Sequence, residues 1–186
     1  MREFLTYLDK GDDVIDCGIG PLADYSIEFA KLGYSVTGVD ISETTLNYAK
    51  KQIDLSGQKI KLIQDDFSEF KNVKGKYDMV FCTGTFGHIP SYLSLEVMKR
   101  FNKKTKMNRY ALIQFWIDKE PSVSQIIYGI FYDIGFKIKR VFGDVFPVNC
   151  STYTYSEIED LCGRSGFKII KTAGGYHFLQ KIIELN

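Results

Sequence analysis

Short apolar runs alternate with amphipathic segments along most of the chain. The runs at 14–15 and 36–39 are each followed by an acidic residue, as expected of buried strands that end at a polar edge. Between them, small or apolar residues recur at helical spacing on one face: Leu22, Ser26, Phe29 and Ala30. Gly33 closes that segment. Such alternation predicts a parallel sheet with helices on both faces, an α/β fold.

Two further helices have recognisable ends. Ser42 is a suitable N-cap for a second helix, and Gly57 lies just beyond its last turn. Its inner side carries Leu46, Ala49 and Ile53. Near the end of the chain, Ser156 and Glu159 form an S-x-x-E capping box, which predicts the start of a late helix.

A glycine turn follows the first strand. Gly18 and Gly20 allow the backbone to turn tightly and to approach a ligand closely. The N–H groups at the start of the next helix face whatever lies on that turn. Asp40, at the end of the second strand, can accept both hydroxyls of a ribose. The unit therefore predicts a site for a nucleoside-containing cofactor.

Two cofactor classes compete for this turn. Gly18, Gly20 and Ala23 fit the pattern G-x-G-x-x-G/A of NAD(P)-dependent oxidoreductases. However, Asp16 precedes the glycines, and an extra negative charge does not help to bind a pyrophosphate. A cofactor that carries an ammonium and a sulfonium would gain from it. The run resembles motif I of class I S-adenosylmethionine-dependent methyltransferases, although Pro21-Leu22 stands where the third glycine is usual.

The resemblance extends over most of the chain in the family's order. Segments similar to the family's later strands, and to its late helix, lie at 60–67, 76–90, 109–117, 155–170 and 177–185. The resemblance implies a single domain over 1–186, with a Rossmann-like doubly wound sheet of seven strands in the order 3-2-1-4-5-7-6. Strand 7 is expected to be antiparallel.

The resemblance also implies the residues that bind S-adenosyl-L-methionine. They are Asp16, Gly18, Gly20, Asp40, Ile41, Asp65, Asp66, Phe67 and Thr83. In the family the glycine motif holds the methionine part, and the acid after strand 2 holds the ribose. A carboxylate after strand 3 commonly meets the adenine amino group; Asp66 with Phe67 is the preferred match, and Asp65 is the close alternative.

The methyl acceptor is expected near the loop after strand 4. The loop CTGTFGH is more like those of small-molecule methyltransferases than of amino-methylating enzymes, and it lacks the Pro-Cys pair of cytosine methyltransferases. His88 is the candidate general base, with a structural role near the next helix start as the alternative. Phe86, Trp116 and Tyr153 are candidates for an acceptor pocket, where aromatic faces stabilise a sulfonium. Trp116 could equally pack beneath an insertion.

The segment at about 118–155 is the least regular part of the chain. It is expected to be an insertion, either a lid over the acceptor or a structural addition. A homodimer is another way of covering the site. A third interpretation of the whole chain is a methyltransferase-like subunit that binds a partner without catalysis.

Composition limits the kinds of partner and the cellular location that we expect for this chain. The chain has 186 residues, 45% of them hydrophobic and 25% charged, and a net charge of +1. These values suit a soluble globular domain without a field that recruits nucleic acid or anionic membrane. No apolar run could span a membrane and no signal peptide opens the chain, so we expect a cytoplasmic protein. Four cysteines, Cys17, Cys82, Cys150 and Cys162, lack metal-like spacing and are expected to be free thiols; no metal is expected.

A basic cluster precedes the expected fifth strand. It comprises Lys99, Arg100, Lys103, Lys104, Lys106 and Arg109. One interpretation is a phosphate-binding patch for nucleic acid, which would suit an RNA methyltransferase. The favoured one is a solvated helix end, where cations complement the helix dipole.

Overall fold

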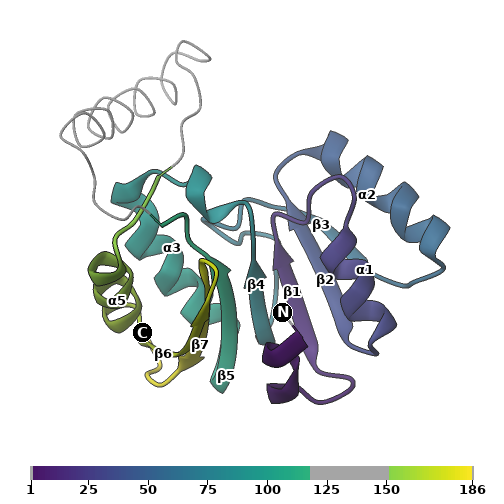
Figure 1. Ribbon diagram of the computed structural model, residues 1–186. Helices are drawn as coiled ribbons and strands as arrows, with labels where there is room; N and C mark the ends of the chain where they lie inside the picture. Colours follow the sequence, from purple (N-terminus) through teal and green to yellow (C-terminus); the bar gives the residue numbers. More distant parts are fainter. Residues whose placement is uncertain (1, 118–150, 186) are drawn as a thin grey trace, which may run out of the picture.

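A seven-stranded sheet forms the centre of the protein (Figure 1). The structure is a computed structural model that describes residues 2–117 and 151–185. The strands are β1 (Asp13–Cys17), β2 (Ser35–Asp40), β3 (Lys61–Gln64), β4 (Tyr77–Cys82), β5 (Thr105–Gln114), β6 (Phe167–Ala173) and β7 (Tyr176–Lys181). They lie in the order β3-β2-β1-β4-β5-β7-β6, and β7 is antiparallel to β5 and β6. The predicted strand order and the antiparallel strand are confirmed.

Helices cover both faces of this sheet (Figure 1). The elements are η1 (Arg2–Tyr7), α1 (Asp24–Lys31), α2 (Glu43–Ser56), η2 (Phe86–His88), α3 (Ser91–Lys104) and α5 (Tyr155–Arg164). Phe101 of α3 and Ile158 of α5 belong to one buried cluster with Val80 of β4. Phe29 of α1 packs with Phe81, the next residue along β4, on the other face. Alternate residues of β4 therefore serve two cores, as a doubly wound sheet requires.

The predicted ends of α2 are confirmed. Ser42 accepts a hydrogen bond from the Thr45 N–H at 3.2 Å, and Gly57 has the left-handed φ of 70° that ends the helix. The three residues expected on its inner side, Leu46, Ala49 and Ile53, are all buried.

The predicted starts of two other helices are wrong. Leu22 lies before α1 and is 58% exposed, because α1 begins only at Asp24, after Ala23 in a left-handed conformation. The capping box of α5 is formed by Thr154 and Glu157 instead of Ser156 and Glu159. Thr154 has the extended backbone that an N-cap needs, and the helix has already begun at Tyr155.

Two expected strands are shifted, and the late part of the chain is only partly described. β5 begins four residues before 109 and ends at Gln114, and β7 ends at Lys181 rather than near 185. As a result, Lys106 of the basic cluster lies within β5 instead of before it. Most of the insertion expected at 118–155 lies outside the described residues. Within those residues, no helix is long and apolar enough to cross a membrane.

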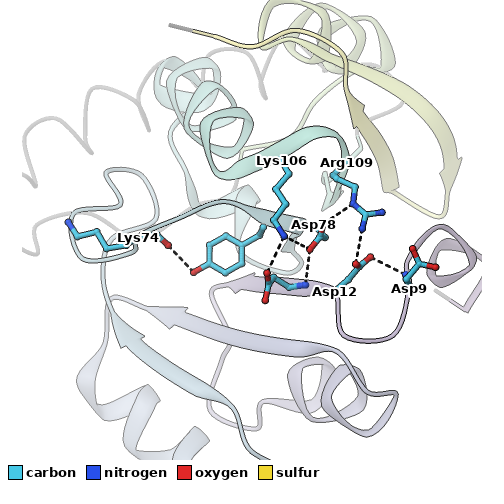
Figure 2. Close-up of polar contacts among 8 residues, drawn as sticks. Asp9, Asp12, Lys74, Asp78, Lys106 and Arg109 are labelled. Carbon is cyan, nitrogen blue, oxygen red and sulfur yellow. Dashed lines mark hydrogen bonds and ion pairs between the residues drawn. The ribbon is translucent and has the colours of Figure 1, made fainter.

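A polar network joins three strands near the N-terminal ends of β1 and β4 (Figure 2). Asp78 of β4 accepts the Asp13 N–H at 3.0 Å and pairs with Lys106 at 2.7 Å. Its other oxygen accepts from Arg109 Nε at 2.7 Å, and Arg109 Nη2 reaches Asp12 at 2.7 Å. This network lies at the end of the sheet opposite to the glycine turn, so it contributes to the scaffold and not to the site.

Candidate functional site

The C-terminal ends of four parallel strands bring the predicted cofactor residues to one edge of the sheet. Asp16 of β1 lies between Gly38 of β2 and Phe81 of β4. Asp40 of β2 is paired with Gln64 of β3. Open α/β sheets bind ligands beyond the carboxyl ends of their strands, at the point where the strand order reverses. Here the order reverses between β1 and β4, beside the glycine turn.

The glycine turn folds back onto β2 and against the loop after β4. The N–H groups of Gly18 and Ile19 both donate to the Val39 carbonyl, at 2.8 and 3.1 Å. Gly18 has φ +84°, and a Cβ atom there would lie 2.3 Å from Thr85 Oγ1. Gly20 has φ +69°, but nothing lies within 4 Å of the Cβ position. Gly18 is thus required by packing, whereas Gly20 leaves its backbone accessible.

The unusual third position of the motif is accommodated by Ala23. Ala23 is buried, has φ 53° and immediately precedes α1. Its carbonyl accepts the Ile27 N–H at 2.9 Å. A left-handed conformation is usual for glycine and uncommon for alanine. The turn through Pro21 and Leu22 therefore ends in the kind of conformation that the missing glycine would favour.

Asp16 is a buried carboxylate that has no cationic partner in the part of the chain that the structure describes. It is 2% exposed, and its Oδ2 accepts a hydrogen bond from Ser26 Oγ at 2.7 Å. Burial raises the pKa of Asp16 to about 7 and the nearby charge of Asp40 adds to this, while the Ser26 hydrogen bond opposes it. Within residues 2–117 and 151–185, no Lys, Arg or His forms an ion pair with it. A ligand cation at this position would favour the ionised form.

The carboxylate of Asp40 lies at the C-terminal end of β2, where the Ser42 N–H engages one of its two oxygens. Its Oδ1 accepts the Ser42 N–H at 2.9 Å, and no partner of Oδ2 lies in the described part of the chain. Ile41, the next residue, is 66% exposed despite its apolar side chain. Asp40 and Ile41 together offer a hydrogen-bond acceptor beside an apolar surface.

Asp65 and Asp66 have different roles. Asp65 is 6% exposed, and its carboxylate accepts three backbone N–H groups, those of Lys71, Asn72 and Val73, at 2.7–3.1 Å. Asp66 is half-buried, and its Oδ1 accepts only the Ser68 N–H, at 2.8 Å. Asp65 therefore holds the turn after β3, while Asp66 keeps an oxygen for a ligand. The Phe67 ring packs against Phe101, with centroids 5.8 Å apart.

Thr83 takes part in a small polar cluster at the ends of β4 and β5. Its hydroxyl donates to Gln114 Oε1 at 2.7 Å, and the Gly84 N–H donates to the same oxygen at 3.0 Å. Tyr176 Oη lies 3.4 Å from the Thr83 hydroxyl. Gln114 and Thr85 are site residues that the sequence analysis missed. Gln114 could have been found, because it is a polar residue at the end of the apolar run of β5. For Thr85, nothing in the local sequence indicates that it packs against Gly18.

The four acceptor-side candidates separate into two layers. Phe86 is fully buried, with its ring 4.8 Å from that of Phe115. Tyr153 is 6% exposed, and its hydroxyl lies 2.7 Å from Ser94 Oγ. Both rings belong to the core. Trp116 and His88 lie together nearer the surface, with ring centroids 5.4 Å apart; Trp116 is half-buried and His88 is exposed.

Gly87 permits this arrangement. A Cβ atom on Gly87 would lie 2.9 Å from Trp116 Cδ2, so the indole packs directly on the backbone of η2. Of the predicted acceptor-side residues, the structure therefore brings His88 and Trp116 together. It places Phe86 and Tyr153 in a buried cluster with Phe115.

The three cysteines that the structure describes have the buried environment of unreactive thiols. Cys17, Cys82 and Cys162 are free and buried. Burial raises the thiol pKa of all three, to about 12 for Cys162, so the nucleophilic thiolate is disfavoured. Cys150 lies outside the described residues. Among those that are described, no group of three or more His, Cys, Asp or Glu side chains is placed to hold a metal ion.

Comparison with known sequences identifies relatives of this chain. Residues 14–107, about half of the chain, match a protein family described as a methyltransferase domain. The chain is 34% identical over 74 residues to the Bacillus subtilis protein YqeM, which is named as a methyltransferase. That similarity covers 39% of this chain and 28% of YqeM, so the chain spans less than a third of that relative's length.

Comparison with solved structures shows the same fold. A structure from Methanosarcina mazei, described as one of the SAM-dependent methyltransferases, has a TM-score of 0.70 and 20% identity, with 99% of each chain covered. Magnesium protoporphyrin IX methyltransferase from Synechocystis PCC 6803, solved with bound SAM, has a TM-score of 0.66 and 19% identity. That similarity covers 92% of this chain and 69% of the other.

Proposed function

We propose that this chain, which belongs to the methyltransferase domain family, binds S-adenosyl-L-methionine and transfers its methyl group to a small-molecule acceptor. The observation that carries the proposal is Asp16, a buried carboxylate with no cation among the described residues. S-adenosyl-L-methionine brings an ammonium and a sulfonium, whereas a pyrophosphate-containing dinucleotide would add negative charge. The charge of the site therefore favours the sulfonium cofactor over NAD(P).

The edge of the sheet fits the cofactor along its length. Asp16 and the accessible backbone of Gly20 suit the methionine part. Asp40, with its available Oδ2, suits the ribose hydroxyls, and the exposed Ile41 gives the adenine an apolar surface. Asp66 can accept from the adenine amino group, since among the described residues the one hydrogen bond to its carboxylate, from the Ser68 N–H, engages Oδ1.

The chemistry asks mainly for positioning. When bound, S-adenosyl-L-methionine supplies an already activated methyl group, and the protein holds the acceptor in line with it. In this proposal the exposed His88 takes a proton from the acceptor, and the Trp116 ring, which contacts His88, offers a planar surface beside it. The buried rings of Phe86 and Tyr153 pack against Phe115 in the core. A small acceptor suits this arrangement, because the pair is compact and no nucleic-acid-binding module accompanies it.

Two glycine variants test the cofactor site. Gly20 and Gly57 have almost the same φ, 69° and 70°, and neither has an atom within 4 Å of its Cβ position. Gly20→Ala and Gly57→Ala should therefore carry a similar backbone cost of about 1–2 kcal/mol. Only Gly20→Ala should weaken S-adenosyl-L-methionine binding, by about tenfold or more in calorimetric titration, because its Cβ enters the space assigned to the ligand.

Ligand-induced stabilisation provides the direct measurement. A ligand at about 100 times its dissociation constant adds roughly 2.7 kcal/mol to the free energy of unfolding. We expect this increase with S-adenosyl-L-methionine and S-adenosylhomocysteine and none with NAD(H). An increase with NAD(H) alone would indicate an oxidoreductase. The absence of any increase, with all three ligands and a folded protein, would leave the non-catalytic binding subunit as the better account.

A further inference from the structure

A second pocket lies away from the cofactor edge, between α3 and the turn after β3. It has a volume of about 540 Å³. Its polar wall is the C-terminal half of α3, with Lys99, Arg100, Lys103 and Lys104. Phe70 and Leu185 supply an apolar wall. The volume is within the range of pockets that bind small organic molecules, and nothing in the proposed methyl transfer uses it.

Arg100 is under-satisfied in this pocket. Its Nε is buried and has no hydrogen-bond partner within residues 2–117 and 151–185, where the one acceptor of its Nη1 is the Glu69 carbonyl, at 3.3 Å. A buried guanidinium N–H without an acceptor is costly and uncommon. An anion in the pocket, which Arg100 lines, would add an acceptor for this guanidinium.

Lys104 is also without an anionic partner among the described residues. Its Nζ donates to the Val73 carbonyl at 2.6 Å and lies 5.5 Å from the centroid of the Phe70 ring. Burial, followed by the nearby Lys74, lowers the pKa of Lys104, and the nearby Asp65 carboxylate opposes this without outweighing it. The two acids of the lining are already engaged, because Glu69 pairs with Lys71 and Glu96 pairs with Lys99.

The backbone of the pocket is strained at Phe70. Phe70 has φ 52°, a left-handed conformation that is an outlier for a bulky aromatic residue. The conformation is enforced by its neighbours: the Phe70 N–H donates to the Asp66 carbonyl at 2.8 Å, and Asp65 accepts the next three N–H groups. Strain that the surroundings maintain is typical of ligand sites. Here it fixes the aromatic wall opposite the cations of α3.

The helix dipole does not account for these features. Lys103 and Lys104 lie in the last turn of α3, where cations complement the partial negative charge. Arg100 lies one turn earlier, and an unpaired buried Nε gains nothing from the dipole. A long nucleic-acid track is disfavoured as well, because Lys106 and Arg109 are neutralised by Asp12, Asp13 and Asp78 (Figure 2). Within the basic cluster, the cations that form no ion pair with a described residue are Arg100, Lys103 and Lys104, and all three line this pocket.

We propose that this pocket binds a small phosphate-bearing ligand, with the phosphate on Arg100, Lys103 and Lys104 and an organic part against Phe70 and Leu185. The proposal is independent of the cofactor assignment. Planar, multi-donor groups such as guanidinium are suited to phosphate oxygens, and lysines add charge. The apolar wall distinguishes an organic phosphate from the free ion.

Calorimetric titration of the full chain at fixed ionic strength tests the site with two probes, inorganic phosphate and phenyl phosphate. We expect saturable binding of both, tighter for phenyl phosphate. Arg100→Gln should weaken binding by about tenfold or more, and Lys103→Gln, on the same pocket wall, by a smaller factor. Lys50→Gln, which makes the same change of charge on α2 beside Asp54, should leave binding unchanged.

Three outcomes would overturn the proposal. The first is no saturable binding of either probe to the folded protein. The second is an equal loss of affinity in Lys50→Gln and Lys103→Gln, which would indicate general charge attraction. The third is binding of a single-stranded RNA oligonucleotide that both pocket variants weaken, with no binding of phenyl phosphate, which would make the surface a nucleic-acid contact. Equal affinity for the two probes would overturn the organic part of the proposal, because it would mean that Phe70 and Leu185 do not contact the ligand.

Discussion

At the scale of single residues, Asp16 illustrates a conflict between stability and binding. The pKa of its carboxyl is raised to about 7 from an ordinary value of 3.8, mainly by burial. Because the folded protein binds the proton more tightly than the unfolded chain, the free energy of unfolding should fall as the pH rises from about 4 to about 7. The charge is costly without a ligand and useful with one.

The first prediction concerns Asp16→Asn. The amide cannot ionise and can still accept the Ser26 hydrogen bond, so at pH 8 the free protein should be more stable than the wild type, by on the order of 2–4 kcal/mol. The gain should vanish near pH 4, and S-adenosyl-L-methionine binding should be weakened. Urea unfolding at pH 5 and pH 8 measures the first effect. A variant that is no more stable at pH 8 would show that the buried carboxylate has a cation partner in the free protein.

The second prediction separates Asp65 from Asp66 by the same chemical change. In Asp65→Asn an amide N–H₂ group would face backbone N–H donors, so we expect a loss of about 2–3 kcal/mol of stability. In Asp66→Asn the single bond to Ser68 can persist, so stability should change by less than about 1 kcal/mol, while cofactor affinity falls. Urea unfolding with a parallel cofactor titration distinguishes the two. If Asp65→Asn instead lost cofactor affinity and Asp66→Asn lost stability, Asp65 would be the residue that contacts the adenine.

The sequence could not decide between these two acids for a physical reason. Both follow β3, and both are suitable acceptors at a strand end. The decision depends on where the N–H groups of residues 71–73 point, and that is set by the whole turn. The same limit applies to Phe86 and Trp116: both are aromatic residues after strands, and only the packing of Phe86 on Phe115 and of Trp116 on Gly87 separates core from surface.

At the scale of elements, helix ends were predictable where a single local signal exists. For α2, Asp40 ends the preceding strand and Ser42 stands just before the apolar helical pattern, with Gly57 just after it; both ends are confirmed. For α5, Thr154 with Glu157 and Ser156 with Glu159 fit the same pattern. The choice is made outside the helix: the Tyr153 N–H donates to the Trp116 carbonyl at 2.9 Å, which keeps the chain extended up to Thr154. Contacts across 37 positions of sequence (116 to 153) are not visible in a local pattern.

The third prediction tests that cap. Thr154 Oγ1 accepts the Glu157 N–H at 3.3 Å, and Glu157 Oε2 accepts the Thr154 N–H at 2.7 Å. Thr154→Ala should therefore lower the free energy of unfolding by about 1 kcal/mol, and Ser156→Ala, within the first turn, by less than about 0.5 kcal/mol. Urea unfolding of both variants is the measurement. Equal losses would mean that the helix start is shared between the two residues.

At the scale of the whole molecule, the sequence predicted an α/β sheet from alternation, and the family resemblance supplied the strand order. Alternation alone cannot order strands, because every β-α-β unit looks alike locally. The polar network at the opposite edge went unpredicted, since Asp78 and Arg109 are distant in sequence and lie in segments taken as a strand and a basic cluster. That network binds β1, β4 and β5 together beneath the cofactor edge (Figure 2).

The last prediction follows from Asp78, whose side chain is 6% exposed. Burial acts to raise its pKa, but hydrogen bonds from Lys106, the Asp13 N–H and Arg109 outweigh burial and lower the pKa. Its contribution to stability is therefore full above the ordinary value of 3.8 and is lost as the pH falls through the lowered pKa. Asp78→Asn should cost about 2 kcal/mol at pH 7, because two cations lose their shared carboxylate, although Lys106 keeps Asp13 and Arg109 keeps Asp12.

The matched control is Asp54→Asn, which breaks an exposed pair with Lys50 and should cost less than about 1 kcal/mol. Urea unfolding at pH 7, 5 and 3 should show the difference between wild type and Asp78→Asn shrinking only below about pH 4. If Asp78→Asn costs no more than Asp54→Asn, the three strands are held by backbone pairing and apolar packing alone. A larger loss of stability in Asp78→Asn than in Asp54→Asn would instead mean that the carboxylate of Asp78 helps to hold β1, β4 and β5 together beneath the cofactor edge.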